Sequence, residues 1–269
     1  MLADIMDNGF DSDNRTGVKT RALNGYTLRF DLQDGFPLVT TKKIHTKSII
    51  HELLWLISGS TNIKYLKDNG VRIWDEWTDE NGDLGPVYSK QWRDWEHIRY
   101  EYISPSKRYE HIHTDQLANA IDRLKTNPDC RRIIVSAWNV GEIDKMALPP
   151  CHCFYQFLKR GEFLDCILYQ RSCDSFLGVP FNIASYSLLL SMVCQITAFK
   201  PGHFIWNGGS VHIYHNHFEQ VREQLSREPY PYPQLKLNPS VDSIDSFTYD
   251  DFNIVNYGFY PAIKAEVAV

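Results

Sequence analysis

The sequence is short of several features that define broad classes of protein. Six cysteines in 269 residues are too few for a disulfide scaffold, so we expect reduced thiols and a cytoplasmic location. No uninterrupted apolar run approaches the roughly 18 residues of a membrane-spanning helix, and the acidic N-terminus differs from a signal peptide. The chain has 28 lysines and arginines against 33 aspartates and glutamates, and the net charge of −5 argues against a broadly basic nucleic-acid-binding surface.

The chain also lacks low-complexity tracts, internal repeats and long flexible linkers. Because 43% of its residues are hydrophobic, a chain of this length can bury a full core without disulfides. We therefore expect one domain over residues 1–269. The predicted helices and strands are interleaved irregularly, without the βα alternation of a doubly wound sheet, and this order favours an α+β fold.

Four segments have the apolar spacing of helices, and Asn182 lies where the N-cap of the third would be. They span residues 46–58, 115–126, 183–198 and 217–227. Strands are expected at residues 132–138, 154–159, 162–171, 203–206 and 211–215, the second and third forming a hairpin about Arg160-Gly161. The polar stretch 95–115 is expected to be an exposed insertion loop.

Cys151 stands in the first local cluster with reactive groups, Pro149-Pro150-Cys151-His152. Two prolines restrict the backbone before the thiol, and a neighbouring imidazole can favour the nucleophilic thiolate. The alternative is that Cys151 simply packs, as buried cysteines commonly do. Cys151 and Cys153 have no second Cys/His pair at zinc-ligand spacing, so we expect no metal site.

Two further clusters are polar. His212 and Tyr214 share one face of an expected strand and are suited to hydrogen bonding. Arg131-Arg132 could bind phosphate, because a guanidinium matches two oxygens at once. Adjacent side chains on a regular strand point to opposite faces, so both arginines serve one pocket only if the strand is irregular there. The alternative is that both reach solvent.

Long motifs run nearly end to end through the chain. They are GFPLVTTKK (35–43), IIHELLW (49–55), IWDEWTDENGDLGPVY (73–88), CRRIIVSAWN (130–139), LPPCH (148–152), QRSCD (170–174), FLGVPFNIASY (176–186) and QLSREP (224–229). Together they resemble the thymidylate synthase family. The resemblance implies a single domain with a large mixed β-sheet packed by helices, one sheet face forming a homodimer interface.

The reaction that the resemblance implies uses dUMP and 5,10-methylenetetrahydrofolate. A one-carbon unit is transferred to C5 of dUMP and reduced, which gives dTMP and dihydrofolate, through a covalent adduct between Cys151 and C6. Adding a thiolate at C6 makes C5 nucleophilic, so covalent catalysis divides one difficult step into easier ones.

The same resemblance implies which residues act. Catalytic roles fall to Cys151, Glu52, Arg171, Asn182, Tyr88, His152 and Asp174. The dUMP contacts are Arg15, Arg131, Arg132, Arg171, Ser172, Cys173, Asp174, Asn182, His212, Ile213 and Tyr214, with Arg131 and Arg132 reaching over from the other subunit of a homodimer. The folate contacts are His45, Ile73, Trp74, Trp77, Asp174, Gly178, Phe181 and Ala268, while Lys42 either attracts the glutamate tail or is solvated.

Elementary chemistry agrees with two of these roles. A carboxyl on a buried apolar helix should have a raised pKa, which suits Glu52 to proton transfer near neutral pH; the alternative is a buried carboxyl paired for stability. The Asn182 carboxamide carries both a donor and an acceptor, so it can pair with N3–H and O4 of uracil together.

Four positions depart from the usual pattern of the family: Ser89, Ser210, His215 and Glu266. Glu266 stands where a proline is usual, and without proline the unligated tail is looser. Poor closure would admit water, so a dUMP hydroxymethylase that uses the same folate is the alternative activity. An RNA-binding module is disfavoured by the net charge, and an inactive dimer by the reactive residues present.

Overall fold

The computed structural model describes residues 1–103 and 106–267, with side chains described outside residues 101–108. Its centre is a six-stranded sheet in the order β1-β2-β8-β7-β6-β5. The strands are β1 (Phe10–Ser12), β2 (Thr20–Asp31), β5 (Ile134–Ser136), β6 (His152–Arg160), β7 (Phe163–Asp174) and β8 (Lys200–Tyr214). β7 and β8 pair in parallel, whereas the other neighbours are antiparallel, so the sheet is mixed.

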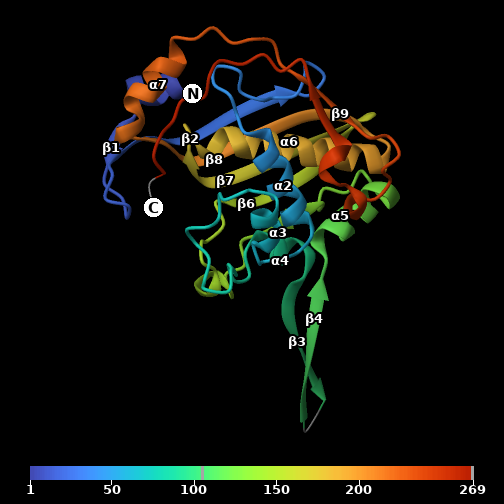
Figure 1. Ribbon diagram of the computed structural model, residues 1–269. Helices are drawn as coiled ribbons and strands as arrows, with labels where there is room; N and C mark the ends of the chain where they lie inside the picture. Colours follow the sequence, from blue (N-terminus) through green and yellow to red (C-terminus); the bar gives the residue numbers. More distant parts are fainter. Residues whose placement is uncertain (104–105, 268–269) are drawn as a thin grey trace.

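The two longest helices lie across one face of this sheet (Figure 1). The helices are α1 (Leu2–Asn8), α2 (Thr46–Ile57), α3 (Lys64–Asp68), α4 (Tyr88–Arg93), α5 (Gln116–Thr126), α6 (Gly178–Thr197) and α7 (Phe218–Leu225). A small two-stranded sheet pairs β9 (Gln234–Leu237) with β10 (Phe252–Val255). Sheet and helices share one core, which confirms the predicted single-domain α+β fold with a mixed sheet.

α6 is the central helix of the core. Its apolar side chains face neighbours on nearly every side, and Ala184, Leu188 and Val193 have at most 1% of their surface exposed. By length and composition α6 could cross a membrane, but 78% of its apolar window is buried inside the protein. Burial of this kind is expected of the core helix of a folded domain, in which the apolar surface is covered by the sheet.

The start of α6 differs from the prediction. The helix begins at Gly178, so Asn182 lies inside it and is not the N-cap. The Asp174 carboxylate accepts the N–H groups of Phe176 and Leu177 at 3.1 and 3.2 Å, which fixes the turn that leads into the helix. Pro180 falls in the first turn, where a missing N–H costs little.

β8 is one continuous strand where two were predicted. Gly208-Gly209 has the composition of a turn but serves close packing. A Cβ at Gly208 would lie 2.4 Å from the Trp206 ring, and one at Gly209 would lie 2.9 Å from the Arg171 carbonyl oxygen. Glycine in a strand interior commonly marks such close approach. In contrast, the predicted β6–β7 hairpin about Gly161, which has a φ of +63°, is confirmed.

Residues 95–115 form a β-hairpin, so the expected loop was wrong. β3 (Trp95–Ile103) and β4 (Ser106–Thr114) pair antiparallel along their whole length and project from the body (Figure 1). Tyr100 and Tyr109 face each other across the strands with ring centres 5.3 Å apart. Aromatic cross-strand pairs of this kind stabilise hairpins even where the side chains are solvated. The segment is exposed, as expected, but regular.

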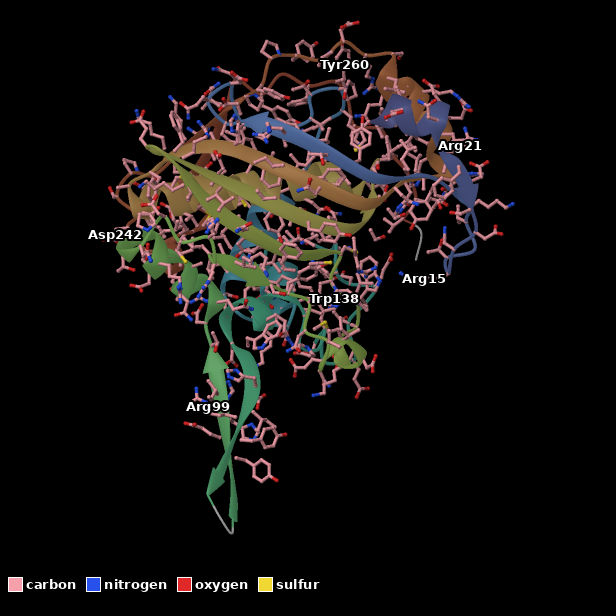
Figure 2. The ribbon with its side chains drawn as sticks, turned by 180° about the vertical axis from the view of Figure 1, so that it is seen from behind. Arg15, Arg21, Arg99, Trp138, Asp242 and Tyr260 are labelled. Atoms are coloured by element: carbon pink, nitrogen blue, oxygen red, sulfur yellow. The ribbon has the colours of Figure 1, made fainter. Side chains whose placement is uncertain are left out.

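The face of the sheet opposite α6 carries exposed large side chains. Tyr155 and Phe157 of β6 point into the core, so the alternating residue Phe154 points the other way. It stacks on Tyr169 of β7 with ring centres 5.7 Å apart, and Ile134 of β5 is exposed on the same face. Seen from behind, the strands lie in front of the helices, with no helix drawn across them (Figure 2).

Candidate active site

Cys151 is held by its backbone on two sides. Its N–H donates to the Tyr88 hydroxyl at 2.7 Å, and its carbonyl accepts the N–H of Arg171 on β7 at 2.8 Å. The Arg171 guanidinium donates to the carbonyls of Pro149 and Pro150 at 2.8 and 2.9 Å. Because α4 and β7 both fix the segment around the thiol, the position of Cys151 is set before any ligand binds.

The thiol of Cys151 is partly buried and lies near two cations. Burial raises its pKa, while the positive charges of Arg171 and Arg15 lower it. The Arg171 guanidinium also lies over the ring of Trp138, 5.4 Å from its centre; Figure 2 labels Trp138 and Arg15. The two cations offset part of the cost of forming the thiolate, which is the nucleophilic species.

His152 begins a buried chain of hydrogen bonds. Its Nε2 accepts from Asn182 at 2.9 Å, and its Nδ1 lies 3.2 Å from the Tyr186 hydroxyl. The chain continues through Gln170, which donates to Asn182 Oδ1 at 2.9 Å and accepts from Trp206 Nε1 at 2.9 Å. Burial lowers the pKa of His152 to about 3, so the ring is neutral at physiological pH.

This chain orients the Asn182 amide. Its acceptor is fixed by Gln170 and its donor by His152, so the amide cannot turn over without losing both bonds. A carboxamide has two N–H groups and two acceptor lone pairs. One donor and one acceptor therefore remain for a ligand that offers the complementary pair.

Glu52 on α2 is a second titratable group of the site. Trp74 Nε1 donates to its Oε1 at 2.8 Å. Burial raises the pKa of Glu52 to about 7, although the bond from Trp74 lowers it. Burial, together with the charges of Cys151 and Glu52, raises the pKa of Tyr88 well above its usual range. Glu52 and Cys151 are thus close enough to Tyr88 to disfavour its ionisation.

The ends of β7 and β8 bring several predicted residues together. Asp174 pairs with His212 in the parallel register, and the His212 and Tyr214 rings meet edge to face with centres 5.4 Å apart. Burial lowers the pKa of His212, opposed by the Asp174 carboxylate. Tyr214 also lies within electrostatic range of Arg15 and Cys151. These groups therefore belong to the same site as the thiol.

Three predicted dUMP contacts need qualification. Ser172 is partly exposed next to Arg171 and can serve a ligand with its side chain. Cys173 and Ile213 have no exposed side-chain surface, so the side chains of these two pack in the core. Neither residue therefore offers surface to a ligand in this structure.

The residues expected to bind folate include apolar side chains that reach the surface. Ile73 is 36% exposed, and Trp77 packs edge-on against Trp74 with ring centres 5.9 Å apart. Gly178 and Phe181 are three residues apart on α6 and share one face. A Cβ at Gly178 would lie 3.8 Å from Asn182 Oδ1, so the face is continuous with the amide.

Two other groups border this surface. His45 precedes α2, and its Nδ1 lies 2.7 Å from the Ser48 hydroxyl. Lys42 is buried; its ammonium lies 3.4 Å from the centre of the Phe176 ring, and burial lowers its pKa to about 8. Lys42 is therefore not solvated. Ala268 lies outside the described residues.

Arg131 and Arg132 are not brought to the site within one chain. Both are exposed in the turn before β5, which begins only at Ile134 and not at residue 132 as predicted. Gln156 donates to the Arg131 carbonyl at 2.9 Å and fixes the turn. Because Arg131 and Arg132 lie in a turn and not on a regular strand, their side chains need not point to opposite faces. Both can therefore serve the same pocket.

Four further residues contribute to the site without having been predicted: Gln170, Tyr186, Trp206 and Trp138. The first two lie in the motifs QRSCD and FNIASY, so their place beside Arg171 and Asn182 in the sequence was a usable signal. Trp138 likewise lies in the motif CRRIIVSAWN, whereas Trp206 on β8 lies outside the quoted motifs and reaches the site only through the sheet.

The arrangement combines a held thiol, nearby guanidinium groups, an oriented amide and a carboxyl that titrates near neutral pH. The sequence of the chain matches the family model described as thymidylate synthase over residues 1–269. The chain belongs to the thymidylate synthase family. Members of this family are one-carbon methyltransferases that bind dUMP and use methylenetetrahydrofolate. Within the described residues, no group of three or more His, Cys, Asp or Glu side chains is placed to hold a metal ion.

Proposed function

We propose that this chain converts dUMP to dTMP with 5,10-methylenetetrahydrofolate, through a covalent bond between Cys151 Sγ and C6 of the pyrimidine. The observation that carries the proposal is the position of the thiol, fixed by Tyr88 and Arg171 beside the oriented Asn182 amide. The folate supplies both the one-carbon unit and the hydride that reduces it. The exposed Ile73 and the partly buried Trp77 offer apolar surface to a flat heteroaromatic ring, and the Asp174 carboxylate can accept from the N–H groups of such a ring.

Asn182 would recognise the base. Its remaining N–H donates to O4 of uracil and its remaining lone pair accepts N3–H. When the Cys151 thiolate adds to C6, the electron pair of the C5–C6 bond moves toward C5 and O4, and the Asn182 donor stabilises the negative charge there. C5 thereby becomes the nucleophile for the one-carbon unit.

Glu52 would move protons during the later steps. C5 must lose its proton before the Cys151–C6 bond breaks and the thiolate leaves. A carboxyl with a pKa of about 7 is present in both protonation states at neutral pH, so Glu52 can accept and return a proton. His152 stays neutral and holds Asn182 rather than exchanging a proton itself.

The phosphate and sugar would lie along the ends of β7 and β8. Arg15, Arg171 and Ser172 surround the phosphate, and His212 with Tyr214 meets the 3′-hydroxyl. Guanidinium groups suit a phosphate dianion because each offers paired, charge-assisted hydrogen bonds. The positive charges of Arg171 and Arg15 are close enough to Cys151 to lower the pKa of its thiol. This proximity supports placing the phosphate near the thiol.

We further propose a homodimer in which Arg131 and Arg132 complete the partner's phosphate site. Support comes from the exposed Phe154–Tyr169 stack and Ile134 on the uncovered face of the sheet, a patch that association would bury. The two arginines are exposed beside that face.

The free state of all six cysteines supports a reducing compartment, the cytoplasm.

The alternative product is 5-hydroxymethyl-dUMP, which would form if water reached the site. The carbonyl of Glu266 lies 2.7 Å from His217 Nε2, so the tail is anchored at that residue although the usual proline is missing. The anchor favours closure and hence reduction to a methyl group.

Product mass separates the two activities. The chain is incubated with dUMP and 5,10-methylenetetrahydrofolate while dihydrofolate absorbance is recorded. We expect a methyl group at C5 and one dihydrofolate per product. A hydroxymethyl product without dihydrofolate would contradict the proposed reaction, and no modified nucleotide would contradict both activities.

A further inference from the structure

The Arg15 loop, residues 13–19, joins β1 to β2 at the edge of the sheet. β1 has only three residues, all of them paired with β2. Arg15 is exposed, yet its charge acts on the Cys151 thiol and on the Tyr214 hydroxyl. A loop that follows so short a strand needs a further attachment to keep Arg15 at the site.

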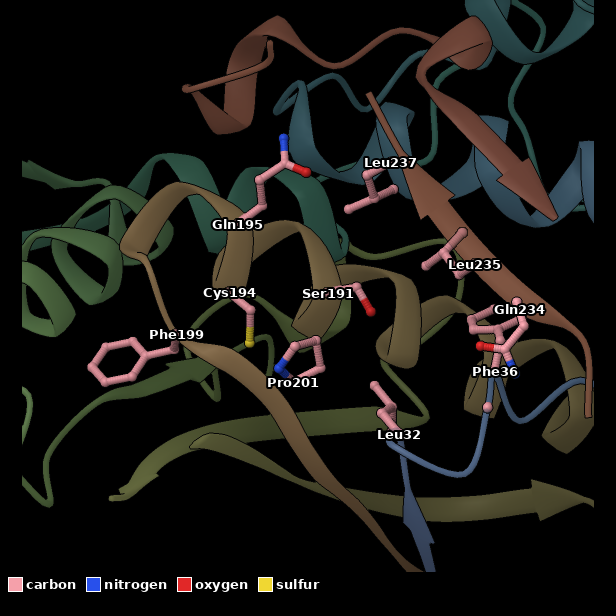
Figure 3. A pocket seen from close by; sticks show the side chains of 11 residues that line it. Leu32, Phe36, Ser191, Cys194, Gln195, Phe199, Pro201, Gln234, Leu235 and Leu237 are labelled. Carbon is pink, nitrogen blue, oxygen red and sulfur yellow. The ribbon is translucent and has the colours of Figure 1, made fainter. Parts of the chain in front are cut away.

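The two ends of β2 are held in different ways. Just beyond the last residue of β2, Leu32 packs against the core and borders a pocket of about 260 Å³ together with Leu235 and Leu237 of β9 (Figure 3). The first residues of β2 instead meet charged groups that are partly open to water, because the side chains of Arg21 and Asp11 are 28% and 45% exposed. Polar contacts therefore hold the end of β2 that leads to the Arg15 loop.

Asp11 is the centre of these polar contacts. Arg21 donates from Nε and Nη2 to its two oxygens at 2.8 and 3.2 Å, and His215 Nε2 lies 3.1 Å from Oδ1. Hydrogen bonding from Arg21, together with His215, lowers the pKa of Asp11 to about 2, so the carboxylate is ionised. The His215 ring also packs against the Phe218 ring, with centres 4.6 Å apart. A ring nitrogen so close to a carboxylate carries its proton, because two acceptors would repel each other.

His215 contacts both ends of the Arg15 loop. Its side chain reaches Asp11 on β1, where the loop begins. Its backbone N–H donates to the Lys19 carbonyl at 2.9 Å, where the loop ends. Because His215 directly follows Tyr214, it ties the base of the loop to the end of β8 that belongs to the site.

We propose that His215 is a positioning residue for Arg15. By joining Asp11 to the end of β8, His215 closes the base of the Arg15 loop and keeps the Arg15 guanidinium near Cys151 before any ligand binds. A loop that is ordered beforehand loses less conformational entropy on binding, so the ligand binds more tightly. The inference rests on the proposed function, in which Arg15 meets the phosphate of dUMP.

Limited digestion with trypsin tests the loop without a ligand. Trypsin cleaves after arginine and lysine, and cleavage in a folded chain requires the segment to open. His215→Phe keeps a flat ring but has no N–H for Asp11, so cleavage after Arg15 should be about threefold to fivefold faster than in the original chain. Cleavage after the exposed Arg99 of β3 is the internal control and should not change. An unchanged rate after Arg15 would overturn the proposal.

Calorimetric titration with dUMP tests whether the closed loop serves the phosphate. His215→Phe should weaken binding about threefold to fivefold. His215→Gln, whose amide N–H reaches about as far as Nε2, should stay within about twofold of the original chain. Equal losses in the two variants would overturn the proposal.

A double-mutant cycle with Arg15 separates positioning from a general structural role. In an Arg15→Ala chain, His215→Phe should weaken dUMP binding no further, because His215 acts through Arg15. A further loss of threefold to fivefold in that chain would overturn the proposal. If the original chain binds no dUMP at all, the proposed function is wrong, and the positioning role of His215 fails with it.

Discussion

Histidines in two regions of the molecule have opposite surroundings. His152 is buried at the active site, accepts from Asn182 at 2.9 Å and has a pKa lowered to about 3 by burial. His111 on the hairpin is exposed and lies 2.6 Å from Glu96, whose pKa it lowers through that bond. The same side chain is a neutral positioning group where water is excluded and a hydrogen-bond partner of a surface carboxylate where it is not. Substitutions should therefore matter most in the buried region.

The largest effect is expected for Cys151→Ala. Removing the nucleophile should lower turnover roughly 10⁴-fold or more. Stability should hardly change, because Tyr88 and Arg171 bind the backbone of residue 151 and not its thiol. Initial rates and thermal unfolding of the same preparation measure both. Turnover near that of the original chain would refute the covalent adduct.

Mixed dimers test whether two chains build each site. Arg131→Ala and Cys151→Ala chains should each be inactive alone. After unfolding and refolding together in equal amounts, half the dimers are mixed and each has one intact site, so about a quarter of the activity should return. A mixture of Cys151→Ala with Arg171→Ala chains is the matched control. It should recover no activity, because Arg171 and Cys151 of one site come from the same chain. No recovery with Arg131→Ala would exclude shared sites.

Glu52→Gln should alter both turnover and the pH dependence of stability. Loss of the proton-transfer group should lower turnover about 100-fold or more. The native pKa of about 7 lies above the ordinary 4.5, so the native state binds the extra proton. The stability due to Glu52 is therefore fully present below pH 4.5 and is lost as the pH rises through 7.

Urea unfolding at pH 5 and pH 8 measures this effect. Relative to the original chain, Glu52→Gln should gain up to about 3 kcal/mol on going from the lower to the higher pH. In Glu52→Gln the amide oxygen can still accept the hydrogen bond from Trp74 Nε1. The variant therefore keeps the packing of the site and serves as a matched control. A stability difference that does not change with pH would show that Glu52 is ionised in the folded chain.

The smallest effects come from a paired comparison of stability. Gln170→Ala leaves Asn182 Oδ1 and Trp206 Nε1 without their buried partner and should cost about 2–4 kcal/mol of unfolding free energy. His111→Ala removes an exposed pair with Glu96 and should cost under about 1 kcal/mol. Denaturant unfolding under identical conditions gives both values. Equal costs would mean that burial does not separate the two regions.

Much of the fold followed from local pattern. The apolar spacing of residues 46–58 predicted α2, and the turn at Gly161 predicted the β6–β7 hairpin, because the residues that decide these elements are adjacent in the chain. The error at Gly208 arose because paired glycines signal a break locally, whereas close packing against Trp206 goes with a continuous strand. The start of α6 was placed too late because Asn182 is a common type of N-cap residue, whereas the helix extends back to Gly178.

The sequence by itself determined the family, the four longest helices and the chemical groups that act, since these depend on residue types and short spacings. Tertiary structure alone decided their protonation and pairing. The pKa of Glu52 rises and that of His152 falls because folding removes both from water. Burial and long-range contacts are properties of the folded chain, and no short stretch of sequence contains them.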